Sequence, residues 1–66
     1  MRIQKTGLSP RERDVLAQLA LGRTRMGVAQ ELGISTGTVN THIEGAFRFL
    51  GASNVVEAVV KFRELC

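Results

Sequence analysis

Few side chains in this sequence could carry out covalent chemistry. His42 is the single histidine and Cys66 the single cysteine among the 66 residues. Their spacing gives no reason to place them with a serine or aspartate as an activated nucleophile. One histidine and one cysteine are too few ligands for a zinc site. Cys66 has no partner for an internal disulfide. The sequence therefore predicts that the protein is not an enzyme. It also predicts no metal site, no cofactor site and no disulfide-bonded fold.

The basic residues are concentrated at one end of the chain. The net charge is +3, but residues 1–25 hold six basic and two acidic residues (+4), and residues 26–66 hold three basic and four acidic ones (−1). Arg23, Thr24 and Arg25 stand at the start of a predicted helix, where free amides and the helix dipole attract phosphate. A basic region on one side suits nucleic acid, although many small domains carry a similar charge.

Capping residues define the elements that must position these side chains. Ser9 to Glu12 and Asn54 to Glu57 read as capping boxes, and Thr24 and Ser35 (or Thr36) as single caps. Glycines follow the first three apolar segments as stop signals. No useful strand-like alternation is present. We therefore predict an all-α fold of four helices, over about 10–21, 25–32, 36–50 and 54–65.

Apolar residues recur at helical spacing in each predicted helix. In the third helix, Val39, Ile43, Ala46 and Leu50 form one stripe. If that stripe faces the core, the opposite face carries Gly37, Asn40, Thr41, Glu44 and Arg48. The inward stripe predicted for the last helix is Val55, Ala58 or Val59, Phe62 and Leu65.

Val56 and Val60 are surplus to the inward stripe of the last helix. Exposed valines on so small a domain indicate self-association through this helix, so we predict a homodimer interface at Val56 and Val60. The alternative is a core that extends further around the helix.

The spacing between the second and third helices indicates a steep corner. Ala29, Gly33 and Val39 stand at i, i+4 and i+10. A small residue suits the point where two helices touch, glycine suits a left-handed turn, and a branched residue locks the second helix. The triplet fits a helix–turn–helix, although other helical corners also favour small, glycine and aliphatic residues.

From Leu8 to Leu65 the chain resembles the LuxR-type (FixJ/NarL or GerE-like) DNA-binding domain. The residues that carry this resemblance are Leu8–Leu16, Gly22–Thr24, Ala29–Ser35, Gly37–Val39, Thr41-His42, Leu50-Gly51 and Glu57–Val59. The resemblance implies a bacterial transcription regulator that binds double-stranded, pseudo-palindromic DNA as a dimer. It also implies a third helix in the major groove, a fourth helix for dimerisation, and a receiver or ligand-sensing domain N-terminal to this one. Residues 8–66 would be the domain, and 1–7 a linker or flexible N-terminal segment.

The same resemblance assigns roles along the third helix. Asn40, Thr41 and Glu44 match the positions that project into the groove, and Thr38 and His42 match positions that contact the DNA backbone. The predicted phosphate contacts are Arg23, Thr24, Arg25, Thr38, His42 and Arg48. Family members often carry lysine or arginine where this chain has Asn40 and Glu44. Asparagine instead suits adenine and glutamate suits cytosine. The alternative for Asn40 and Glu44 is that they are only solvated polar residues on an exposed helix face. The alternative for His42 is a partly buried structural role.

A second hypothesis is a helical protein-interaction module with weak DNA affinity that pairs with a full-length regulator. Glu44 repels phosphate, and Phe49 replaces the family's usual lysine, so both residues favour it. Phe49 and Gly45 have no clear role in the sequence. A free thiol and no targeting segment predict a cytoplasmic setting, and no apolar run approaches the roughly 20 residues that span a membrane.

Overall fold

The computed structural model describes residues 7–65, which contain four helices and no strand. They are α1 (Pro10–Ala20), α2 (Arg25–Leu32), α3 (Thr36–Leu50) and α4 (Val55–Leu65). The all-α prediction is confirmed. The predicted bounds differ by one residue at the end of α1, where Leu21 is the cap, and at the start of α4. Cys66 and all of the predicted 1–7 segment except Gly7 lie outside the described residues.

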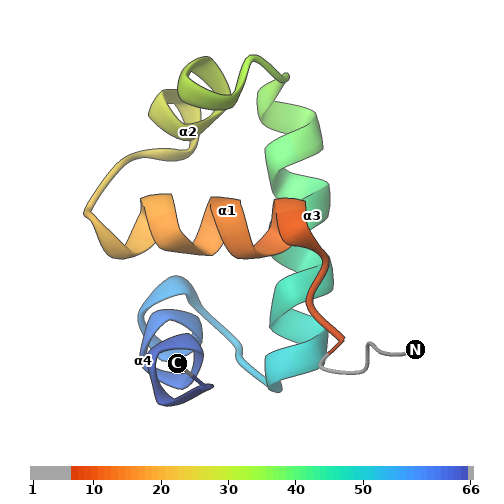
Figure 1. Cartoon of the computed structure of the whole chain (residues 1–66), viewed down its shortest axis with the longest axis vertical. Coiled ribbons are helices and arrows are strands. Elements are labelled where there is room, and N and C mark those ends of the chain that lie inside the picture. The colour runs from red at the N-terminus through yellow and green to blue at the C-terminus, as the bar shows by residue number, and fades with distance from the viewer. Residues whose placement is uncertain (1–6, 66) are drawn as a thin grey trace.

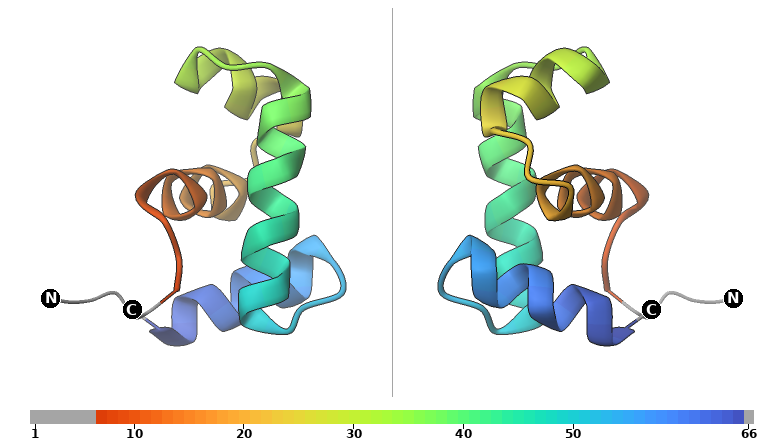
Figure 2. Two further views of the ribbon diagram at one scale, coloured as in Figure 1. Left: turned by 90° about the vertical axis from the view of Figure 1, so that its right-hand side faces the viewer. Right: turned by 90° about the vertical axis from the view of Figure 1, so that its left-hand side faces the viewer.

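The long helix α3 is the axis on which the other helices are arranged (Figure 1). α1 crosses it near its middle, α2 lies beside its N-terminal end and α4 beside its C-terminal end (Figures 1 and 2). α3 thus joins two regions of the domain that differ in their other helices.

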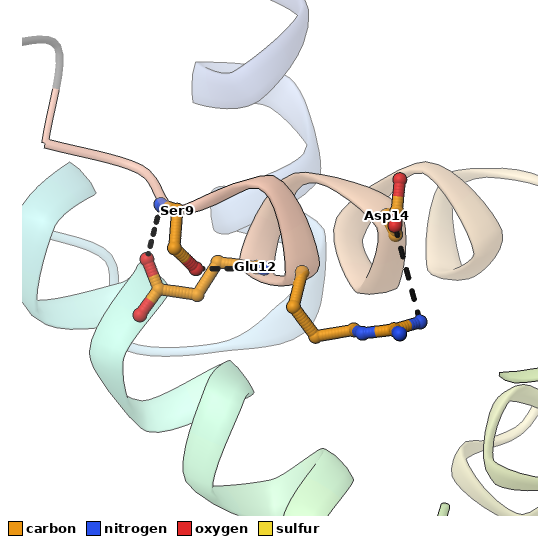
Figure 3. Close-up of polar contacts among 4 residues, drawn as sticks. Ser9, Glu12 and Asp14 are labelled. Carbon is orange, nitrogen blue, oxygen red and sulfur yellow. Dashed lines mark hydrogen bonds and ion pairs between the residues drawn. The ribbon is translucent and has the colours of Figure 1, made fainter. Parts of the chain in front are cut away.

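Side-chain caps fix where each helix begins. Ser9, Thr24 and Ser35 each accept a hydrogen bond from the amide three residues later, at 3.1, 3.0 and 3.1 Å. The Glu12 carboxylate accepts from the Ser9 amide at 3.0 Å and closes the predicted capping box (Figure 3). These bonds satisfy amides that a helix start leaves free.

The predicted capping box at α4 closes differently. Asn54 Oδ1 accepts from the Glu57 amide at 2.8 Å, as expected of a cap. The Glu57 carboxylate, however, accepts from the Ser53 amide at 2.7 Å. The carboxylate therefore satisfies the amide one residue before the cap, and the prediction is correct for only one of the two bonds.

The corner between α2 and α3 is a turn of Gly33, Ile34 and Ser35. Gly33 has a φ of +70°, in the left-handed region that glycine adopts without a Cβ clash. This turn lets the Ile34 amide donate to the Ala29 carbonyl at 3.0 Å, which ends α2. The bond fixes the direction in which α3 leaves the corner.

Two groups of buried side chains form the core. The α2 cluster joins α1, α2 and α3, and its members are Val15, Leu19, Val28, Ala29, Val39 and Ile43. The α4 cluster joins α1, α3 and α4 with the segment before α1, and its members are Leu8, Leu16, Ala46, Ala58 and Phe62. The predicted inward stripe of α3 is confirmed at Val39, Ile43 and Ala46, while Leu50 is half-buried.

The inward stripe predicted for α4 is wrong at its end. Ala58 and Phe62 are buried, but Leu65, the last residue of α4, is 56% exposed. Val56 and Val60, the surplus valines, are 74% and 50% exposed. The core does not wrap far enough around α4 to cover them.

Gly45 lies where α1 approaches α3. A Cβ at this position would clash with Oε2 of Glu12, the same carboxylate that closes the α1 capping box (Figure 3). Glycine costs up to about 1 kcal/mol in a helix interior relative to alanine. The close approach of Glu12 gives a physical reason for it.

Candidate nucleic-acid interface

The exposed face of α3 carries the residues predicted to contact bases. Val39 and Ile43, buried at 0% and 2% exposure, turn the opposite side of the helix outward. On that side Thr41 and Glu44 are exposed, and Asn40 is half-buried. The structure therefore brings the three predicted base-contact residues onto one surface, with Arg48 exposed further along the helix.

The start of α2 and the residues just before it carry cationic side chains, and Arg25 adjoins the exposed face of α3. Arg23 and Arg25 are exposed on either side of Thr24, whose side chain caps the Gly27 amide. The amides of Arg25 and Met26 precede the first hydrogen-bonded turn of the helix, so they can donate outward. Guanidinium groups and outward amides together favour phosphate.

Arg25 and Asn40 form a direct link between α2 and α3. Nη1 of Arg25 donates to Oδ1 of Asn40 at 2.7 Å, across 15 residues of sequence. The predicted phosphate contact and the predicted base contact are thus hydrogen-bonded to each other. Sequence reasoning missed this pair, because the contact depends on the angle of the helix–turn–helix corner and not on local spacing.

Two threonines near the start of α3 already make hydrogen bonds within the helix. The Thr41 hydroxyl donates to the Gly37 carbonyl at 3.1 Å, so its oxygen can still accept a hydrogen bond. Thr38 Oγ1 lies 2.9 Å from Ser35 Oγ. Both threonines are exposed. His42 is half-buried, which limits its access to a ligand.

The other end of α3 contains two contacts that sequence reasoning missed. The Lys61 ammonium donates to the Gly51 carbonyl at 3.1 Å, which places a positive charge at the negative end of the helix dipole. A Cβ at Gly7 would clash with the ring of Phe49, so this ring lies directly against the segment before α1. The lysine ten residues after the helix stop at Gly51 was the available signal for the first contact, and no local spacing signalled the second.

Arg11, like Arg13, belongs to the exposed surface of α1. Its guanidinium pairs with Asp14 at 4.0 Å, one turn away on the same helix (Figure 3). Such an exposed pair contributes little to stability.

The described part of the chain offers no site of another kind. Residues 7–65 contain no group of three or more histidine, cysteine, aspartate or glutamate side chains placed to hold a metal ion. No helix among them is both long and apolar enough to cross a membrane. No cavity opens between the helices described.

Comparisons with known proteins agree with this geometry. Residues 6–62 match the GerE family, described as bacterial regulatory proteins of the luxR family. The chain is 45% identical over 62 residues to the HTH-type transcriptional activator RamA of Corynebacterium glutamicum, covering 94% of this chain and 22% of RamA. It is 44% identical over 54 residues to the transcriptional activator protein SolR of Ralstonia solanacearum, covering 82% of this chain and 23% of SolR.

A third relative is the probable transcriptional regulatory protein NarL of Mycobacterium tuberculosis, 39% identical over 54 residues, with 82% of this chain and 25% of NarL covered. The chain thus spans about a quarter of the length of these curated relatives. The family is one of transcription regulators and not of enzymes, in agreement with the prediction from the sequence. The chain belongs to the luxR family of bacterial regulatory proteins, as a GerE-type helix–turn–helix DNA-binding domain.

Proposed function

We propose that this domain binds double-stranded DNA sequence-specifically, with α3 in the major groove. The observation that carries the proposal is the exposed face of α3, where Asn40, Thr41 and Glu44 stand beside Arg25 at the start of α2. A helix of this width fits the major groove, where each base pair displays a distinct set of donors and acceptors. Base contacts come from these three α3 residues.

Phosphate contacts come from the residues that flank this face. One DNA strand is contacted by Arg23, Arg25 and the outward amides of α2. The DNA backbone along α3 is contacted by Thr38, His42 and Arg48. The capping role of Thr24 leaves its hydroxyl hydrogen free to donate. Phosphate contacts position the domain on DNA, and base contacts decide the sequence.

The domain acts as a dimer through α4. Support comes from Val56 and Val60, which are exposed one turn apart on the same helix. A two-fold dimer places two copies of α3 about 34 Å apart, on successive turns of a pseudo-palindromic site. The relatives are about four times as long as the matched segment, which supports a further N-terminal receiver or ligand-sensing domain in a cytoplasmic regulator.

A binding titration tests the DNA proposal. Fluorescent duplexes selected by the wild-type domain from a randomised pool are titrated at two salt concentrations. We expect Asn40→Ala to relax preference at one base pair by about 1–3 kcal/mol. Arg23→Ala weakens all duplexes alike and lowers the salt slope by about 1. Arg63→Ala on α4 is the matched control, because it removes the same charge from an exposed site away from α2.

The second candidate function is a protein-interaction module with weak DNA affinity. Glu44 favours it, since an exposed carboxylate on the groove-facing side of α3 repels phosphate. Absence of binding by the wild-type domain at low salt and tens of micromolar protein would reject the DNA proposal in favour of this one. Equal effects of Asn40→Ala and Arg23→Ala on all sequences would instead contradict the division into base and phosphate contacts.

A further inference from the structure

The hydrogen bond between Arg25 and Asn40 changes what Asn40 can offer a ligand. Its Oδ1 accepts from the Arg25 guanidinium at 2.7 Å. Bonds from a charged donor are about twice as strong as neutral ones. The side-chain amide has two donor hydrogens and an acceptor oxygen with two lone pairs, and this bond occupies one lone pair and fixes the direction of the oxygen. The NH2 group makes no hydrogen bond to any residue that the structure describes, so it is the half of the amide most open to a ligand.

The frame around the pair is rigid enough to hold this arrangement. Val28, one turn after Arg25 on α2, is fully buried, and so is Val39, which precedes Asn40 on α3. The bonds at Gly33 and Ser35 fix the corner between the two helices. Because both backbones are anchored next to the pair, the long Arg25 side chain supplies most of its remaining freedom. Asn40 itself is half-buried.

We propose that Arg25 is a positioning residue for base recognition, which rests on the proposed binding of α3 in the major groove. Arg25 holds the Asn40 amide by its oxygen, so that Asn40 acts on DNA as a hydrogen-bond donor. Guanine, adenine and thymine present acceptors in the major groove, whereas cytosine presents only a donor. Asn40 therefore discriminates against cytosine at its position, instead of selecting adenine alone through a bidentate pair.

This role differs from that of a phosphate contact in a measurable way. A cation that only neutralises phosphate affects all sequences equally and contributes about 0.9 to the salt slope. A cation that orients a base-reading amide affects one base position. Once the Asn40 amide has been removed, removing Arg25 as well should not change the preference at that base position further. Substitutions of residues that act as a unit are non-additive. Remaining donors of the guanidinium can still contact phosphate, so the test must be the base preference.

The experiment compares four proteins, namely wild type, Arg25→Ala, Asn40→Ala and the double variant, on a selected duplex and its single-base substitutions. Wild type should bind weakest when cytosine occupies the position read by Asn40, by about 5- to 150-fold. Arg25→Ala should lose that preference to the same degree as Asn40→Ala, and the double variant should lose no more. Arg23→Ala, which removes the same charge two residues away, should keep it.

Different failures have different meanings. If wild type binds specifically but Arg25→Ala keeps the preference at that position, the positioning role is overturned and the proposed function stands. A wild-type preference for adenine alone, or for cytosine, overturns the donor role of Asn40. If wild type binds no duplex, both proposals fail. In the free domain, the Asn40 side-chain NH2 signals in a 15N NMR spectrum should shift in Arg25→Ala, and unchanged signals also overturn the proposal.

Discussion

The two ends of α3 carry surfaces of opposite chemistry over cores of similar kind. On the N-terminal side, the α2 cluster lies beneath polar groups, namely the exposed Thr41 and Glu44 and the half-buried Asn40. At the C-terminal end, the α4 cluster lies beside exposed apolar side chains such as Phe49, Val56 and Val60. Leu21 and Met26 are also exposed near α2, but they stand on separate elements. The contrast agrees with the proposed DNA contact at the first end and the proposed dimer contact at the second.

The interior does not share this division. α1 gives Val15 and Leu19 to the α2 cluster and Leu16 to the α4 cluster. α3 likewise gives Ile43 to one and Ala46 to the other, and Phe47 packs against both. Because two helices belong to both clusters, we expect the domain to unfold as one unit, although its two surfaces differ in chemistry.

The largest expected effect tests this unity. Phe62→Ala removes the largest side chain of the α4 cluster and should cost about 3–5 kcal/mol. A domain of this size has little more than that in total, so α2 should be lost together with α4. Thermal unfolding followed by circular dichroism measures the loss, and amide exchange locates it.

Phe49→Ala is the matched control, since it deletes the same ring from a site that is 44% exposed. We expect it to cost less than about 1 kcal/mol. Protected α2 amides in a Phe62→Ala domain whose α4 has melted would show that the two clusters fold independently.

A smaller effect should distinguish the ends by function. Ser35→Ala removes the cap of α3, and Asn54→Ala removes the cap of α4. Each should cost about 0.5–2 kcal/mol of stability, as such caps do. Urea unfolding measures both. Only Ser35→Ala should also weaken DNA binding, because it loosens the first turns of α3, where Thr38 and Asn40 lie. Equal DNA affinities for the two variants, at temperatures where both are folded, would contradict that distinction.

Near the middle of α3, where α1 crosses, the effect of a substitution on stability should depend on the Glu12 carboxylate. Gly45→Ala gains up to about 1 kcal/mol of helix propensity but displaces the Glu12 carboxylate from the Ser9 amide. The two effects should nearly cancel in the wild-type background. In a Glu12→Ala background the same substitution should stabilise the domain by up to about 1 kcal/mol. Urea midpoints of the four proteins measure the coupling, and identical changes in both backgrounds would exclude it.

Features that depend on local sequence were predictable. The caps at Ser9, Thr24 and Ser35 act through the amide three residues away, so the first three helix starts are correct. The apolar stripe of α3 assigned its exposed face for the same reason, since spacing along a helix fixes direction. The candidate base-contact residues follow from that stripe together with the family resemblance.

Features that depend on how helices cross were not predictable. Arg25 bonds to a residue 15 positions away, and Glu12 approaches Gly45 on a different helix. Both contacts require the angle and separation of two helices, which spacing along one helix does not specify. Leu65 failed for a related reason. Its spacing places it on the inward face of α4. Spacing does not show how far along α4 the packed surface extends.

The smallest expected effect on stability concerns the apolar end. Val56→Asp replaces a side chain that is 74% exposed, so the isolated domain should change by no more than about 0.5 kcal/mol. Self-association, in contrast, should be lost. Sedimentation equilibrium over a wide concentration range measures it. Met26→Asp, at a 64% exposed site on α2, is the matched control and should leave the association unchanged.

The affinity of this association should itself be low. Fully burying a valine contributes about 1.5–3 kcal/mol, whereas bringing two molecules together costs at least about 4 kcal/mol. Two valines per protomer therefore support only a weak dimer, and DNA would stabilise it by holding both copies on one site. Cooperative binding to a two-half-site duplex should then be lost in Val56→Asp, while binding to a single half-site is retained. If both duplexes respond alike, or the wild-type domain binds its two half-sites independently, α4 is not the dimer interface.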